Sequence, residues 1–226
     1  MGDIGSGSGE DGSGGFGSGG FGSGDLGSGD LGSGFAGGNA DVNALSTFEL
    51  AGLPSGMTPL AIAASTGHED IVAALIARNA DVNYRSPLVL AAAQGFVGIV
   101  ERLLRSGAIV NQACGESAAM CGGLDNLGAT ALHAAARLAH PAIVQALLDY
   151  NADPRATTIF GADPRSLAND AARRSAADPA YGARLQEKGG GQPEEVLRLL
   201  DRNARDRTRS MRREPSSRNA NRTAYA

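Results

Sequence analysis

The sequence of 226 residues contains no tryptophan, two cysteines, four tyrosines and six phenylalanines. Two cysteines, Cys114 and Cys121, are too few for a disulfide framework, so free thiols are the expectation. No stretch approaches the roughly 18 consecutive apolar residues that a membrane span requires. The N-terminus also lacks the basic and apolar regions of a signal peptide. These absences predict an intracellular protein, cytoplasmic or nuclear, without a membrane-spanning helix.

Charge is distributed unevenly along the chain. Residues 1–38 are mostly Gly and Ser, with five acidic residues and no Lys or Arg, whereas residues 202–226 carry eight Arg against Asp206 and Glu214. Only the region between them has enough apolar residues to bury a core, because ordering a chain costs conformational entropy. We therefore predict a disordered Gly/Ser-rich segment at 1–38, a folded domain at 39–203, and a disordered Arg-rich tail at 204–226.

The folded region contains an internal repeat, which is the first pattern to seek in a sequence. Three segments of equal length align without gaps. In each, 17 positions separate the first residue from the Leu that opens a Leu-Leu or Leu-Ile pair: Leu75, Leu103 and Leu147. A rigid element of constant length therefore recurs. The segments are TPLAIAASTGHEDIVAALIARNADVN (58–83), SPLVLAAAQGFVGIVERLLRSGAIVN (86–111) and TALHAAARLAHPAIVQALLDYNADPR (130–155).

Each segment predicts a pair of helices. Thr58, Ser86 and Thr130 are candidate N-cap residues, and a Pro follows the first two of them at the position where a helix tolerates it. Apolar residues then recur at helical spacing. Gly67 and Gly95 can adopt the positive φ that ends a helix. Each pair would leave an apolar face that only the next pair can bury, which is the logic of a solenoid.

These motifs resemble ankyrin repeats. The matching residues include Thr58-Pro59-Leu60, Gly67-His68 and Ala80-Asp81-Val82-Asn83, and the family has a period of about 33 residues. The resemblance covers roughly residues 39–203 and implies an all-α solenoid of stacked helix-turn-helix units with hairpin-like loops. It also implies that His133 hydrogen-bonds the backbone of a neighbouring loop.

A fourth unit departs from the pattern. Residues 164–172 could form its first helix and residues 193–200 its second, but the spacing between the two is far longer than in the other units. We interpret it as a diverged C-terminal capping repeat with an inserted loop around Asp178–Gln192, since solenoids need capped ends. About three clear repeats plus this cap are expected.

Chemical motifs do not indicate an enzyme. Two G-x-G-x-x-G matches, at 7–12 and 12–17, neither follow a strand nor open a helix, so they cannot place a phosphate on a helix N-terminus. The Cys114 and Cys121 spacing is wider than that of zinc sites, and His133 has the structural role given above. No group of His, Ser, Cys or carboxylate residues shows the pairing of nucleophile, base and acid that catalysis requires. We expect no catalytic activity, no cofactor and no metal.

The resemblance implies binding through a concave face and loop tips. The long loop adds Met120, Leu124 and Leu127 on the same side. A protein-interaction module or adaptor, monomeric and binding an unidentified protein, is the main prediction. The alternative is a nucleic-acid-associated or nuclear regulatory protein that uses the Arg-rich tail; a solvated, unbound tail is also open. The predicted partner-binding residues are Met57, Ser65, Thr66, Tyr84, Arg85, Ala93, Gln94, Ala129, Arg137 and Leu138.

Overall fold

The computed structural model describes residues 41–47, 56–115, 128–187 and 189–213, with side chains as far as Arg209. The chain divides by its internal contacts into two units, 1–39 and 40–226, and all the described residues belong to the second. The predicted Gly/Ser-rich segment 1–38, the loop residues Met120, Leu124 and Leu127, and the tail beyond residue 213 lie outside the described residues.

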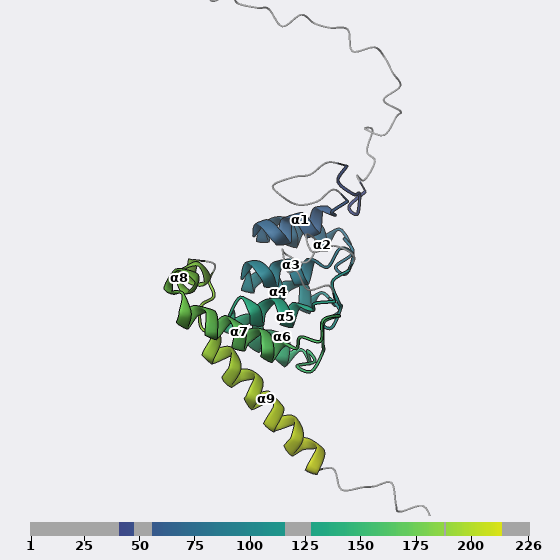
Figure 1. Ribbon diagram of the computed structural model, residues 1–226. Coiled ribbons are helices and arrows are strands. Elements are labelled where there is room, and N and C mark those ends of the chain that lie inside the picture. The colour runs from purple at the N-terminus through teal and green to yellow at the C-terminus, as the bar shows by residue number, and fades with distance from the viewer. Residues whose placement is uncertain (1–40, 48–55, 116–127, 188, 214–226) are drawn as a thin grey trace, which may run out of the picture. The chain divides into compact units, whose positions relative to one another are not determined.

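The described residues form nine helices and no strand (Figure 1). Helices α1, α3, α5 and α7 pack side by side as an inner layer, and α2, α4, α6 and α9 form an outer layer behind them. Helix α8 packs against α7. The bounds are α1 Pro59–Thr66, α2 Glu69–Ala77, α3 Pro87–Gln94, α4 Val97–Arg105, α5 Ala131–Arg137, α6 Pro141–Asp149, α7 Pro164–Ala177, α8 Pro179–Glu187 and α9 Pro193–Arg213.

The helix ends follow the sequence signals. Thr58 is the N-cap of α1, and its hydroxyl accepts a hydrogen bond from the Ala61 N–H at 3.1 Å. Ser86 and Thr130 occupy the same position before α3 and α5. Gly67 and Gly95 end α1 and α3 with φ of 84° and 86°, values that favour glycine because it lacks a Cβ. The all-α helical-pair prediction is confirmed.

The core lies between the two layers, and its register follows the repeat. Leu103 and Leu147 are completely buried at equivalent places in α4 and α6. Leu75, the equivalent residue in α2, is only half-buried. Ile71 of α2 is 49% exposed, although its counterpart in α4, Ile99, is buried. Helix α2 is the first outer helix described. No earlier outer helix among the described residues covers this face.

A repeated side-chain hydrogen bond joins successive units. An Asn at the end of one unit accepts, through Oδ1, a backbone N–H from the equivalent turn of the next unit. Because each bond satisfies a backbone donor across a unit boundary, the series fixes the spacing of the stack. The three bonds run from Asp81 to Asn43 at 2.9 Å, from Ile109 to Asn83 at 2.7 Å and from Asp153 to Asn111 at 2.8 Å.

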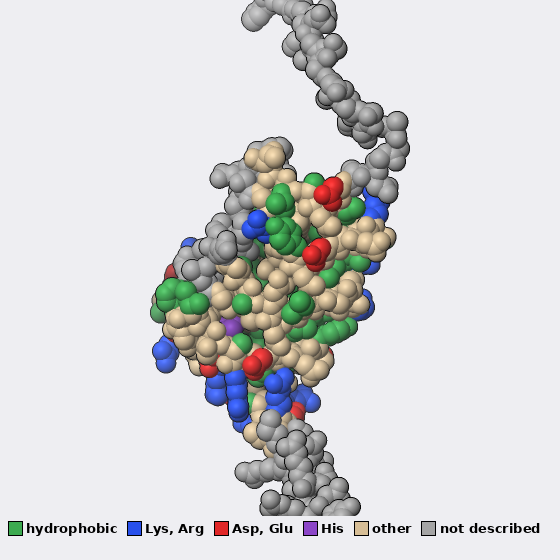
Figure 2. Space-filling view, turned by 90° about the vertical axis from the view of Figure 1, so that its right-hand side faces the viewer, with side chains coloured by type: hydrophobic (Ala, Val, Ile, Leu, Met, Phe, Trp, Pro, Cys, Tyr) green, Lys and Arg blue, Asp and Glu red, His purple; other side chains and the backbone are tan. Residues whose placement is uncertain are grey.

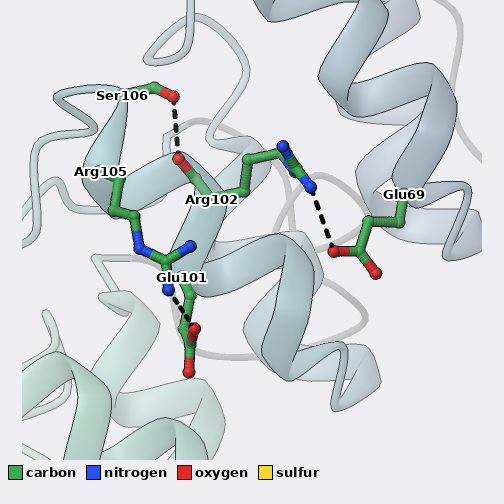
Figure 3. Close-up of polar contacts among 5 residues, drawn as sticks. All are labelled: Glu69, Glu101, Arg102, Arg105 and Ser106. Carbon is green, nitrogen blue, oxygen red and sulfur yellow. Dashed lines mark hydrogen bonds and ion pairs between the residues drawn. The ribbon is translucent and has the colours of Figure 1, made fainter.

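Polar contacts also link the outer helices, as Figure 3 shows. Glu69 at the start of α2 reaches Arg102 of α4, with 3.6 Å between Oε1 and Nη2. A Cβ at residue 98 would come within 2.8 Å of the Glu69 carboxylate, so Gly98 leaves room for this approach. Both charged side chains are about half exposed, and an ion pair of this kind contributes little to stability.

The fourth unit is formed by α7 and α9, where the sequence predicted a diverged capping repeat. The insertion between them was expected to be a loop, and this expectation is wrong, because Pro179–Glu187 forms α8. The boundary placed at residue 203 also differs from the structure. Helix α9 runs to Arg213, so residues 204–213 of the tail that we predicted to be disordered are helical.

Helix α9 continues past the position at which the equivalent helix of the third unit ends. Leu147-Leu148-Asp149-Tyr150-Asn151 ends α6, where Asn151 has φ of 62°, and Leu199-Leu200-Asp201-Arg202-Asn203 repeats that pattern inside α9. The residue that should accept a backbone N–H from this turn is Arg155, which aligns with Asn111. A guanidinium group has no acceptor. Arg155 therefore cannot supply the bond that Asn111 supplies to the preceding turn, and α9 continues through Asn203.

Candidate protein-binding face

Four connecting segments precede the inner helices, and we call them fingers. Of the first finger the structure describes residues 44–47 and 56–57, and of the third residues 112–115 and 128–129. Three of them are closed at the base by backbone hydrogen bonds, such as Thr158 N–H to the Ala162 carbonyl at 2.9 Å and Cys114 N–H to the Ala129 carbonyl at 2.8 Å. The fingers differ in length, whereas the helices of the first three units have 7–9 residues each. They comprise residues 44–57, 84–85, 112–129 and 156–162.

The second finger is only two residues long, and its backbone is strained. Arg85 and Ser86, the N-cap residue of α3 that follows the finger, both have positive φ, 62° and 49°, although neither is a glycine. Each such residue costs on the order of 1–3 kcal/mol, and strain of this kind is concentrated at functional sites. The short connection therefore holds Tyr84 and Arg85 in one defined arrangement between two longer fingers.

Tyr84 and Arg85 form a compact pair. The guanidinium carbon of Arg85 lies 5.2 Å from the centre of the Tyr84 ring, within the range of a cation–π contact. Arg85 also reaches the first finger, since Nη2 lies 3.4 Å from the position that a Cβ on Gly56 would take. Tyr84 remains 42% exposed. The pair presents an aromatic ring beside a positive charge, both favoured at protein-binding hot spots.

The fourth finger carries two exposed apolar side chains that our sequence reasoning missed. Ile159 is 65% exposed and Phe160 is 68% exposed, more than any other large hydrophobic side chain in the described residues. Gly161, with φ of 75°, closes the turn behind them. The available signal was a pair of bulky apolar residues, directly before a glycine, in a segment too short to bury them.

Ile159 also places the fourth finger against the third. Its Cγ2 and backbone N each lie 3.4 Å from the position that a Cβ on Gly128 would occupy. The two fingers are thus in contact at this point.

The predicted binding residues divide by accessibility. Thr66 is exposed, and Ser65, Gln94, Arg137 and Leu138 are half-buried on the inner helices. The Ser65 and Thr66 hydroxyls donate to the Ile62 carbonyl, so they are already satisfied. Three of the predicted residues are buried: Met57, Ala93 and Ala129.

Burial removes those three residues from the candidate surface. Met57 packs with Ala61 and Leu90, whereas Ala93 and Ala129 belong to the main core. The exposed area of each of the three residues is at most 1%. A correction therefore applies to Met57, Ala93 and Ala129, which cannot contact a partner directly in this conformation.

Leu138 is partly covered by the chain itself. The linker between α8 and α9 passes so close that a Cβ at Gly190 would overlap the Leu138 carbonyl oxygen. The insertion thus occupies the end of the inner helix α5, and the surface open to a partner is displaced toward the fingers.

His133 has a structural role that agrees with the expectation from the resemblance. It is fully buried, Nδ1 accepts the Thr130 N–H at 3.1 Å, and Nε2 lies 3.2 Å from the Ala162 carbonyl in the fourth finger. Nε2 is therefore the protonated nitrogen of a neutral ring. Burial lowers the pKa of His133, against smaller opposing effects of hydrogen bonds to the Ala162 and Ala156 carbonyls and of the Asp163 charge.

A pH dependence of stability follows from His133. Because its pKa is lowered in the folded chain, its contribution to stability is complete above its unfolded pKa of about 6.5 and is lost as the pH falls below that value. Urea unfolding at pH 7.5 and 5.5 should show a larger loss of stability for the wild type than for His133→Gln. His68→Gln, at an exposed histidine, should retain the wild-type dependence. Equal losses in all three proteins would contradict this assignment.

The expectation of free thiols is wrong for Cys114, which is buried and disulfide-bonded. Cys121 lies outside the described residues. In the part of the chain that the structure describes, no three His, Cys, Asp or Glu side chains are grouped as a metal site requires. Even α9, the longest described helix, is too polar to cross a membrane.

Stacked helical pairs, inter-unit asparagine bonds and finger-like connections define a helical repeat solenoid with one loop-bearing face. A family model described as ankyrin repeats (3 copies) matches residues 35–114 and 84–158, which together make up more than half of the chain. The chain therefore belongs to the ankyrin-repeat family, whose repeats generally mediate protein–protein interaction. The match ends before α7, in agreement with the divergence of the fourth unit. No curated protein matches the chain significantly.

Proposed function

We propose that this chain is a non-enzymatic adaptor that binds a protein through its fingers. The observation that carries the proposal is the exposure of Ile159 and Phe160 on a short, closed finger. Exposing two large apolar side chains in water is unfavourable, and burying each fully against a partner would gain about 1.5–3 kcal/mol. Interfaces place such residues at their centre.

The Tyr84–Arg85 pair is the second element of the proposed surface. Strained backbone holds it in place, so little conformational entropy is lost when a partner covers it. Of the residues predicted from the sequence, Ser65, Thr66, Gln94, Arg137 and Leu138 would contribute at the edge, since they are half-buried or already hydrogen-bonded. The partner expected is a protein surface with an apolar pocket.

The test is quantitative capture of binding proteins by the immobilised full chain, with wild type and variants compared in parallel. Phe160→Ala should weaken binding of the main captured protein by about 2 kcal/mol, or roughly thirtyfold, because it truncates a central apolar contact. Tyr84→Ala should have an effect in the same direction.

Tyr150 supplies a matched control, since it is 41% exposed, close to the value for Tyr84, but lies at the end of the outer helix α6. Tyr150→Ala should bind as the wild type does. If Phe160→Ala and Tyr84→Ala retain full binding while Tyr150→Ala loses it, the finger proposal is wrong.

A further inference from the structure

Helix α9 carries a line of arginines on the side that faces away from the repeats. Arg198, Arg202, Arg205 and Arg209 are all exposed, and their spacings of four, three and four residues place them along one side of a helix. We call these four residues the arginine stripe. The helix is anchored on the opposite side by Val196 and Leu200, which are 0% and 3% exposed.

The stripe is electrostatically unsatisfied. Within the described residues none of its four guanidinium groups forms an ion pair, and Asp201, one of the two acids beside it, pairs with Arg165 at 3.1 Å. Arg207, on the anchored side, donates to the Ala152 carbonyl at 2.9 Å. The stripe lines a shallow concavity of about 490 Å³ together with Asp201 and Asp206. Figure 2 shows basic side chains gathered at the end of the repeats from which α9 extends.

The stripe exists only because α9 continues past Asn203. In the third unit the equivalent residue, Asn151, ends the helix, and a stop at Asn203 would remove Arg205 and Arg209 from the line. The continuation leaves Asn203 Oδ1 buried without a hydrogen-bond partner among the described residues, which is a cost to the fold.

We propose that α9 binds double-stranded DNA through the arginine stripe. The four residues extend over about 16 Å at 1.5 Å per residue, and an α-helix of 10–12 Å diameter fits the major groove, which is about 12 Å wide. Guanidinium groups bind phosphate oxygens in a bidentate manner. The stripe contains no apolar side chain, whereas the centre of a protein interface is apolar. Contacts to phosphates alone position a duplex without reading its sequence.

This activity is independent of partner binding by the fingers. The experiment is fluorescence anisotropy of the full chain with a labelled 20-base-pair duplex of arbitrary sequence, titrated between 50 and 200 mM salt. Four phosphate contacts give a slope of log K against log salt of about −3.6, or a loss of roughly 150-fold in affinity over that range. Arg202→Ala/Arg205→Ala should halve the slope, leaving a loss of roughly twelvefold.

Two controls separate the stripe from net charge. Arg78→Ala/Arg173→Ala removes the same charge at two exposed residues, one directly after α2 and one in α7, and should keep the wild-type slope. Asp206→Asn should strengthen binding, because it removes an acid from the edge of the stripe. Unfolding temperatures of all variants confirm that they are folded.

Ala204→Pro tests whether the helix itself matters, since proline breaks the helix at an exposed position while the charge is unchanged. It should weaken duplex binding; wild-type affinity would overturn the helical stripe in favour of a flexible basic tail. Absence of binding at 50 mM salt, or equal slopes for the stripe variant and its charge control, would overturn the proposal. Displacement of the duplex by poly-glutamate at equal charge would identify an acidic protein as the ligand instead.

Discussion

Replacing Leu103 by Ala is expected to lower the free energy of unfolding by about 2–5 kcal/mol. Leu103 is completely buried between α4 and its neighbours, and the packed inner and outer layers cannot collapse around the space that it leaves. Chemical unfolding monitored by helical circular dichroism measures the change directly.

Ile71→Ala is the matched control, because Ile71 also lies on an outer helix but is 49% exposed. Its substitution should change stability by less than about 0.5 kcal/mol, as for surface positions generally. A loss below about 0.5 kcal/mol at Leu103, or an equal loss at both sites, would show that the repeat register is wrong.

Removing residues 193–226 is expected to destabilise the domain by at least about 3–6 kcal/mol. The deletion takes away α9, whose Val196 and Leu200 are buried against α6 and α7, and each fully buried side chain of this size contributes about 1.5–3 kcal/mol. Terminal repeats cap the apolar face that the last internal unit would otherwise expose. Thermal and urea unfolding of the shortened chain provide the measurement.

A chain that ends at Arg209 serves as the comparison, since it keeps Val196 and Leu200, the buried apolar residues of α9 on which this prediction rests. Its stability should lie within about 0.5 kcal/mol of the full chain. If both shortened chains unfold like the wild type, α9 does not cap the repeats and the fourth unit is not part of the folded domain.

The sequence predicts the first three units because their signals are local. The hydroxyl caps at Thr58 and Thr130, the glycines after α1 and α3, and the apolar spacing through Leu103 all act within one or two turns of helix. The exposure of Ile71 was not predictable in the same way, since burial depends on whether another unit covers that helix.

The end of the solenoid was predicted less well because it depends on contacts between units. Asn203 repeats the pattern that ends α6 at Asn151, but Arg155 stands where the preceding units carry an asparagine acceptor, and α9 continues to Arg213. The excess spacing between the two helices of this unit was interpreted as a loop, although Pro179–Glu187 forms α8, which packs on α7.

The candidate site was predicted only in part. Tyr84 and Arg85 were assigned by their position in the repeat and are of residue types favoured at hot spots; Tyr84 is exposed and Arg85 half-buried. Met57, Ala93 and Ala129 were assigned by position, but the surrounding packing buries them. Phe160 was missed because side-chain exposure on a finger depends on the turn geometry, which the alignment of helices does not contain.

Backbone deuterium exchange of the full chain, with and without its captured partner, tests the central claim of binding through the fingers most directly. Amides of 84–86 and 156–162 should exchange more slowly in the complex, because a partner that covers Tyr84 and Phe160 excludes water from these segments. Amides of the outer helices α2, α4 and α6 should exchange at the same rate in both states. Protection confined to the outer helices or to α9, with the fingers unchanged, would contradict the account.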